Sequence, residues 1–99
     1  MKKYRIYLSG PMSGLPELNH PAFHKAKAKL ERMGLMVVSP ADLEGQRGEM
    51  SYLEKLRDDL KHLLTCDAIY LMKNWHLSNG AKLEAFVASN LDFRIIYEE

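Results

Sequence analysis

The stretch that decides the fold runs from Tyr4 to Gly14 and reads YRIYLSGPMSG. Its first part, Tyr4 to Leu8, is rich in aromatic and β-branched residues and predicts a short strand. The turn-forming residues that begin at Ser9 and continue to Asn19 end this strand. The first predicted element is therefore a strand whose carboxyl end opens into a loop of small residues.

The segment from Pro21 to Gly34 is predicted as a helix, because its apolar residues recur at helical spacing. Asn19 or His20 is expected to cap its start, and Gly34 is suited to the left-handed conformation that closes a helix. The apolar residues expected on its buried face are Phe23, Ala26, Leu30 and Met33.

The rest of the sequence continues the alternation of strands and helices. Further strands are predicted at 35–38, 68–72 and 93–97, the first of them covered on both faces. A helix with a leucine stripe is predicted after Ser51, which has the spacing to Glu54 of a capping box. That stripe consists of Leu53, Leu56, Leu60, Leu63 and Leu64. A last helix is predicted over 81–89, and the segments 39–49 and 73–79 are predicted as loops.

This alternation predicts one α/β domain over 1–99, a three-layer Rossmann/flavodoxin-like fold with a parallel sheet of about four strands in the order 2-1-3-4. In such sheets ligands bind outside the carboxyl ends of the strands, where the strand order reverses. The loop 9–14 and the segment from Lys73 into the last helix are therefore the expected binding segments.

Composition narrows the class of protein. The 99 residues include 14 Lys and Arg and 13 Asp and Glu, so the net charge of +1 predicts neither a nucleic-acid polymer nor a membrane surface as partner. The single cysteine, Cys66, cannot form an internal disulfide, and no apolar run approaches the ~18–20 residues of a membrane span. The expectation is a cytoplasmic protein that acts on a small molecule.

The loop after the first strand is the first candidate binding segment. Its small residues allow close approach of a ligand, and its N–H and hydroxyl groups suit a phosphate or a sugar, although a simple turn remains the alternative. The residues concerned are Ser9, Gly10, Pro11, Met12, Ser13 and Gly14.

The second candidate segment begins the last helix. Ser78 or Asn79 is suited to cap it, and Gly80 follows, so its first N–H groups form an anion site. Glu84 lies about one turn inside, surrounded by small residues that leave room for a ligand. The alternative for Glu84 is an ordinary solvated charge.

Other polar and aromatic residues carry weaker signals. Tyr7 precedes the loop, where its phenol either reaches the site or packs in the core, and Trp75 either stacks on a base or covers the end of the sheet. Asp67 stands at a strand start, which favours a structural turn. Asp58 and Asp59 are expected to be surface charges. His20 and His24 have no third ligand at a recognisable spacing, so neither a metal nor a cofactor is expected.

Several of these motifs, in this order, resemble a family of small phage and bacterial proteins. The resemblance rests on Ile6 to Gly14, Asn19 with Pro21 to Phe23, Cys66 to Ile69, Trp75 with Ser78, and Gly80 to Glu84. That family is known as a domain of unknown function within the nucleoside 2-deoxyribosyltransferase-like proteins, which include 2′-deoxynucleoside 5′-monophosphate N-glycosidases.

The resemblance implies roles for particular residues. Glu84 matches the nucleophile that attacks the anomeric carbon, Tyr7 the tyrosine that orients it, and Asp67 an aspartate beside the site. Ser78 and Gly80 resemble phosphate-contacting positions of the hydrolases, and Gly10 to Gly14 the loop around sugar and phosphate.

Two features depart from the family pattern. Ser13 stands where the hydrolases usually have a basic residue, and the sequence ends at Glu99, whereas relatives commonly continue into a fifth strand. A parallel sheet of four strands leaves edges that need covering, so a homodimer is expected, for which apolar Phe86 and Leu91 offer a face.

The implied activity is cleavage of an N-glycosidic bond, or deoxyribosyl transfer, on a nucleoside or its 5′-monophosphate. Two alternatives stay open: an inactive nucleotide-binding or host-interaction protein, and a glycohydrolase that acts on an NAD-type dinucleotide.

Overall fold

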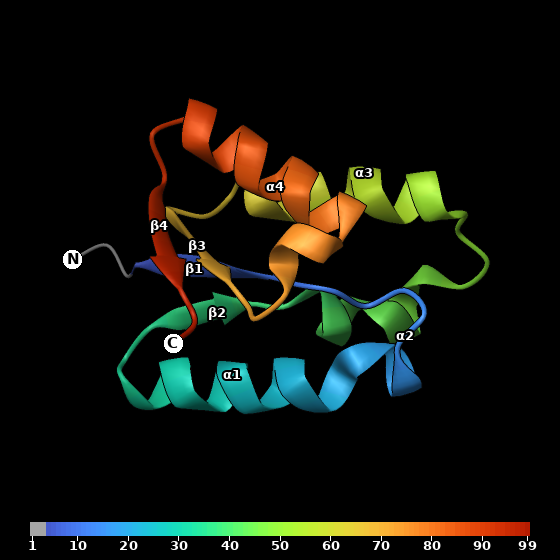
Figure 1. Cartoon of the computed structure of the whole chain (residues 1–99), viewed down its shortest axis with the longest axis horizontal. Helices are drawn as coiled ribbons and strands as arrows, with labels where there is room; N and C mark the ends of the chain where they lie inside the picture. The colour runs from blue at the N-terminus through green and yellow to red at the C-terminus, as the bar shows by residue number, and fades with distance from the viewer. Residues whose placement is uncertain (1–3) are drawn as a thin grey trace.

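Four strands form one parallel sheet in the computed structural model of the chain, which describes residues 4–99 (Figure 1). The strands are β1 (Arg5–Ser9), β2 (Met36–Val38), β3 (Ala68–Leu71) and β4 (Arg94–Tyr97). Their order is β2-β1-β3-β4, and all three neighbouring pairs are parallel. The α/β class and the strand order predicted from the sequence are therefore confirmed. Residues 1–3 of the predicted 1–99 domain lie outside the described residues.

Helices cover both faces of this sheet and complete a three-layer, Rossmann/flavodoxin-like arrangement (Figure 1). Helix α1 (His20–Arg32) lies on one face, and α3 (Tyr52–Leu63) and α4 (Asn79–Asn90) lie on the other. Short helical segments join the layers: η1 (Pro16–Asn19), η2 (Pro40–Leu43), α2 (Glu44–Arg47) and η3 (Trp75–Leu77). Within residues 4–99, no helix is both long and apolar enough to cross a membrane.

The period of two along β1 decides which side chains meet which helix. Ile6 and Leu8 are fully buried in the cluster that includes Phe23 of α1. Tyr7 points the other way, into the cluster that contains Ala85 and Ala88 of α4. The next residue with the orientation of Tyr7 is Ser9, the last residue of the strand, so the carboxyl end of β1 presents two hydroxyl groups to the α4 layer.

Three of the local signals at the helix ends agree with the structure. The expected side-chain cap of α1 does not form, because Asn19 instead donates a hydrogen bond to the carbonyl of Pro11. The Ser51 hydroxyl accepts a hydrogen bond from the backbone N–H of Glu54, and the Glu54 carboxylate accepts one from Ser51, so both halves of the capping box form. Gly34 has φ +88°, the left-handed conformation that glycine tolerates without strain. Ser78 caps α4 by accepting a hydrogen bond from Ala81.

Several expectations about exposure are wrong. Met33 follows the last residue of α1 and is 67% exposed, because it has left the buried stripe of the helix. Leu53 and Leu64 stand at the two ends of α3 and are also exposed, although Leu63 beside Leu64 is fully buried. Strand β2, which was expected to be covered on both faces, pairs only with β1 and is a partly exposed edge strand.

One expectation about secondary structure is also wrong. The segment 39–49, predicted as a loop, contains the short helices η2 and α2.

Phe86 and Leu91 are both exposed on the outer side of the α4 layer. This exposure is compatible with a homodimer face, and the dimer stays a prediction.

We expect a tight approach at Gly10 to limit substitution there. A Cβ atom on Gly10 would lie 2.9 Å from the Cβ of Met72, so Gly10→Ala should lower the free energy of unfolding by about 1–3 kcal/mol in urea titrations. Gly45→Ala is the matched control, because a Cβ there meets nothing within 4 Å and alanine favours the helix. Equal stability of the two variants would contradict the close packing of β1 against Met72.

Candidate functional site

A cavity of about 280 Å³ opens at the carboxyl end of β1. The loop after β1 forms one wall, the connection through η2 and α2 a second, and helices α3 and α4 the others. The lining residues that carry polar or ionisable side chains are Ser13, Glu44, Arg47, Tyr52, Lys55, Asp59, Ser78 and Glu84. The cavity therefore lies where the strand order reverses, the place that the fold favours for ligands.

Glu84 lies at the buried end of this cavity. It belongs to the inner face of α4 together with three alanines, Ala81, Ala85 and Ala88, and only 5% of its surface is exposed. The small alanine side chains bring the helix close to the sheet, so the longer glutamate reaches the end of β1. Glu84 is thus a carboxyl group enclosed by protein that still faces the cavity.

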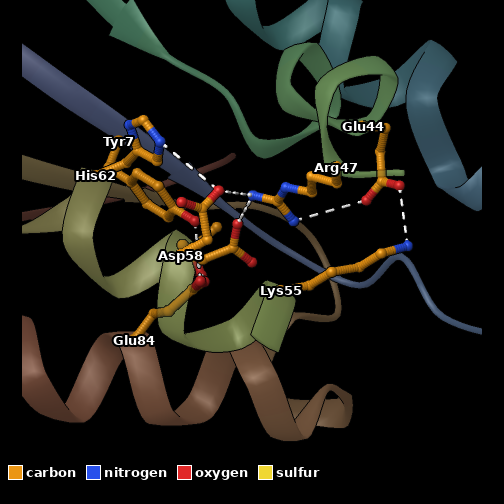
Figure 2. Close-up of polar contacts among 9 residues, drawn as sticks. Tyr7, Glu44, Arg47, Lys55, Asp58, His62 and Glu84 are labelled. Carbon is orange, nitrogen blue, oxygen red and sulfur yellow. Dashed lines mark hydrogen bonds and ion pairs between the residues drawn. The ribbon is translucent and has the colours of Figure 1, made fainter. Parts of the chain in front are cut away.

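Two hydroxyl groups of β1 hold the Glu84 carboxylate. The Tyr7 hydroxyl donates a hydrogen bond to Oε2 over 2.9 Å (Figure 2), and the Ser9 hydroxyl donates one to Oε1 over 2.6 Å. Tyr7 and Ser9 share a face of the strand because they are two residues apart. Each carboxylate oxygen consequently has its own donor, which determines the orientation of the group.

Burial dominates the electrostatics of this group. Burial raises the pKa of Glu84 from 4.5 to about 7, although the hydrogen bond from Ser9 acts in the opposite direction and lowers that pKa. Asp59 raises the pKa of Glu84 further, whereas Tyr7 and Arg47 lower it. Burial, together with the Glu84 charge, raises the pKa of Tyr7 well above its usual value, so Tyr7 remains a donor. Near neutral pH the Glu84 carboxyl is therefore divided between its two charge states.

An ion-pair network forms another wall of the cavity, and Figure 2 shows most of it. Arg47 of α2 is buried and hydrogen-bonds to Asp59 of α3. Its guanidinium also lies 3.4 Å from Asp58 and 3.7 Å from Glu44, and Glu44 pairs with Lys55 over 3.2 Å. Burial raises the pKa of Asp59, and Arg47 opposes that rise.

The prediction that Asp58 and Asp59 are surface charges is wrong for Asp59, which is largely enclosed in this network, whereas Asp58 joins the network and stays partly exposed. Nothing in the sequence pairs Arg47 with Asp59, because one stands in a polar connection and the other on a helix. One feature of the sequence could have indicated a buried charge: the two adjacent aspartates lie on the side of α3 next to its leucine stripe. Only the packing of α2 against α3 shows that these charges are enclosed together.

The structure does not bring Asp67 to the cavity. Asp67 precedes β3 and accepts a hydrogen bond from the backbone N–H of Arg5 over 3.0 Å, at the edge of the sheet where the strands begin. The cavity lies at the opposite edge, so the role that the family resemblance implied for Asp67 does not fit its position. The aspartate that does lie beside Glu84 in the cavity lining is Asp59.

Trp75 is also placed away from the cavity lining. Its ring centroid lies 6.4 Å from that of Tyr97, and the side chain packs against the core cluster beneath α4. Of the two possibilities for Trp75, covering the end of the sheet agrees with this position, and stacking on a ligand in the cavity does not.

The predicted binding segments are divided between the cavity and its surroundings. Gly10, Met12, Ser13, Ser78 and Gly80 line the cavity. Pro11 and Asn79 line an adjoining hollow, which shares Met12, Ser13 and Ser78 with it. Ser9 is fully buried, hydrogen-bonds to Glu84 and does not line the cavity. Its role is therefore to orient the carboxylate, not to contact a ligand.

Gly14 stands apart from both hollows. It is exposed, has φ +81° and lines neither of them, so its place in the chain is explained by the turn alone. In the described part of the chain, no three His, Cys, Asp or Glu side chains are grouped in a way that would hold a metal ion.

Comparisons with known proteins identified a sequence family and a protein of similar structure. A family model described as "Domain of unknown function (DUF4406)" matches residues 4–97. A search of curated proteins found no match. The structure is similar to that of a 2-deoxyribosyltransferase from the bacterium Bacillus psychrosaccharolyticus, with a TM-score of 0.69 and 24% identity over 94% of this chain and 70% of the other. That similarity shows that the two proteins share a fold.

The raised pKa of Glu84 predicts a pH-dependent contribution to stability. Between pH 4.5 and about 7 the folded chain binds more protons at Glu84 than the unfolded chain, so stability is lost as the pH rises through this range. Relative to Glu84→Gln, the wild type should therefore lose up to about 3 kcal/mol of unfolding free energy between pH 5 and pH 8. Urea titrations of both proteins at each pH measure this difference, and parallel pH profiles would contradict the burial of Glu84.

Proposed function

The chain belongs to the DUF4406 family, and on that premise we propose that it cleaves or transfers the N-glycosidic bond of a nucleoside or nucleoside 5′-monophosphate, with Glu84 as the nucleophile. The observation that carries this proposal is the enclosed Glu84 carboxylate, which faces a cavity and is oriented by Tyr7 and Ser9. A carboxylate held in one orientation is pre-positioned for attack on a carbon atom, and positioning of this kind accounts for many orders of magnitude in rate.

The reaction requires a carboxylate beside the anomeric carbon. As the bond between sugar and base breaks, positive charge develops on the sugar ring, and the Glu84 carboxylate stabilises it and forms a glycosyl ester at that carbon. The base departs with the electron pair of the broken bond and takes up a proton. Attack by water, or by a second base, on the same carbon then releases Glu84 as a carboxylate.

Other residues of the cavity have supporting roles in this scheme. Tyr7 and Ser9 keep the Glu84 oxygens in place. The backbone at Gly10 and Ser13, with the first turn of α4, faces the position where the sugar would lie. Asp59 lines the same cavity as a carboxylate paired with Arg47. The departing base takes up its proton from the solvent, and the attacking water or second base gives one up to the solvent.

The size and lining of the cavity favour a small substrate. Its volume of about 280 Å³ is at the lower end of the range for ligand pockets, which favours a single nucleoside unit over an NAD-type dinucleotide. Apolar surface from Met12, Leu18, Pro40 and Leu56 lines it, together with Tyr52, and is suited to the flat face of a base. The deoxyribosyltransferase activity named for the structural neighbour agrees with this substrate class.

A second candidate is nucleotide binding without turnover. The pKa of Glu84 near 7 favours it, because a protonated carboxyl group is no nucleophile. Calorimetric binding measured beside a product assay separates the two functions, since binding without release of free base supports this candidate.

We expect Glu84→Ala to abolish base release from 2′-deoxynucleosides and their 5′-monophosphates while the chain stays folded. Loss of the nucleophile removes the covalent step, so the rate should fall by at least about 10³-fold when free base is measured by chromatography. Glu31→Gln is the matched control, because Glu31 is an exposed carboxylate of α1. Undiminished turnover by Glu84→Ala would exclude Glu84 as the nucleophile.

The activity should also follow the charge state of Glu84. Because the attacking form is the carboxylate, kcat/KM is expected to rise from pH 5 to pH 8 with a midpoint near 7. Ser9→Ala and Tyr7→Phe each remove a hydrogen bond that lowers this pKa, so both should move the midpoint upward, Ser9→Ala further than Tyr7→Phe. A midpoint that neither variant moves would show that another group controls the rate.

A further inference from the structure

Both cationic side chains in the described cavity lining are paired with the same carboxylate. Glu44 Oε1 lies 3.7 Å from Nη1 of Arg47, and Glu44 Oε2 lies 3.2 Å from Nζ of Lys55 (Figure 2). Glu44 belongs to α2, in the connection that closes one side of the cavity, whereas Lys55 belongs to α3. One side chain of the connecting segment thus engages both positive charges at once.

The two cations differ in how firmly they are held. The Arg47 side chain is 3% exposed and also contacts Asp58 and Asp59, so it cannot turn toward a ligand without breaking several ion pairs. The Lys55 side chain is 32% exposed and has Glu44 as the carboxylate partner that the structure shows. Release of Glu44 would therefore free Lys55 first.

The charges in and directly behind the cavity lining sum to an excess of negative charge, even with Glu84 neutral. Besides Glu84, the described lining contains two carboxylates, Glu44 and Asp59, and two cations, Arg47 and Lys55. Asp58 adds another carboxylate to the network just behind the lining. A phosphate group in a cavity of this size would come close to these carboxylates, and like charges in a partly buried site repel strongly.

The remaining polar groups of the cavity suit a neutral sugar. Ser13 and Ser78 carry hydroxyl groups, and the N–H groups at the start of α4 can donate to a hydroxyl oxygen as well as to an anion. The hydroxyl groups of a sugar can in turn donate to Glu44 or Asp59, which a phosphate dianion cannot do. The lining thus satisfies an uncharged nucleoside better than a nucleotide.

From this arrangement we infer that Glu44 is a specificity-determining residue, which holds Lys55 and Arg47 away from the ligand and restricts the substrate to uncharged nucleosides. The inference rests on the proposed function for its assignment of the cavity to a nucleoside. It goes further in excluding the 5′-monophosphates that the proposed function leaves open. By the same argument, loss of the Glu44 charge opens the cavity to a phosphate through Lys55.

Binding measured without turnover tests the inference directly. In a Glu84→Gln background, the four common 2′-deoxynucleosides and their 5′-monophosphates are titrated by calorimetry. The best nucleoside should bind at least about 10-fold more tightly than its monophosphate. Adding Glu44→Gln should tighten the monophosphate by about 10-fold and leave the nucleoside within about 3-fold. Adding Lys55→Gln as well should remove that gain.

Glu49→Gln is the matched control, because Glu49 is an exposed carboxylate of the same connection that lies outside the cavity lining, and it should change neither affinity. Salt provides a measurement that needs no substitution at Glu44. Repulsion of the phosphate is screened by salt, so the preference for the nucleoside should shrink as the ionic strength rises. A cationic phosphate site would instead make that preference grow.

The outcomes separate this inference from the proposed function. Equal or tighter binding of monophosphates in the Glu84→Gln background, or a preference that Glu44→Gln leaves unchanged, overturns the role of Glu44 and leaves N-glycosidic cleavage standing. If Glu44→Gln reduces the preference for nucleosides and the wild-type protein releases no base, the role of Glu44 is supported and catalysis is refuted. Binding of neither ligand class overturns both.

Discussion

The arrangement of this site depends on one contact, the hydrogen-bonded burial of Glu84 between Tyr7 and Ser9. An isolated carboxylate at this depth would be costly, and two hydroxyl donors offset part of that cost by satisfying one oxygen each. The contact also joins α4 to the carboxyl end of β1, so the same interaction that orients the acid holds one wall of the cavity. Its position is a consequence of strand geometry, because residues two apart on β1 face the same layer.

The second determinant of the site is the network around Arg47, which joins the short helix α2 to α3. Arg47 lowers the pKa of Glu84 and Asp59 raises it, so the network influences the charge of Glu84. Because Glu44 engages Arg47 and Lys55 together, this wall presents paired charges rather than a free cation. The connection between β2 and α3 therefore closes one side of the cavity and pairs the charges there.

Much of the architecture follows from local pattern. Alternating strand and helix signals, the Ser51 capping box and the glycine at position 34 predicted the layers, the strand order and the helix ends. Exposure was predicted less well, as Met33 and the terminal leucines of α3 show, because helical spacing does not determine which residues at the ends of a helix contact the core. The small neighbours of Glu84 and a family resemblance predicted it as the candidate nucleophile. Neither predicted its burial or its hydrogen bonds to Tyr7 and Ser9.

The sequence by itself determined the α/β class, the strand order and the loop and helix that flank the site, because period, turn residues and caps are properties of neighbouring residues. The tertiary structure alone decided which acids share the cavity: Asp59 lies in it, and Asp67 lies at the opposite edge of the sheet. It likewise placed Trp75 against the core and enclosed Arg47. Those outcomes depend on the direction of each strand and on contacts between segments distant in the chain, which no local pattern encodes.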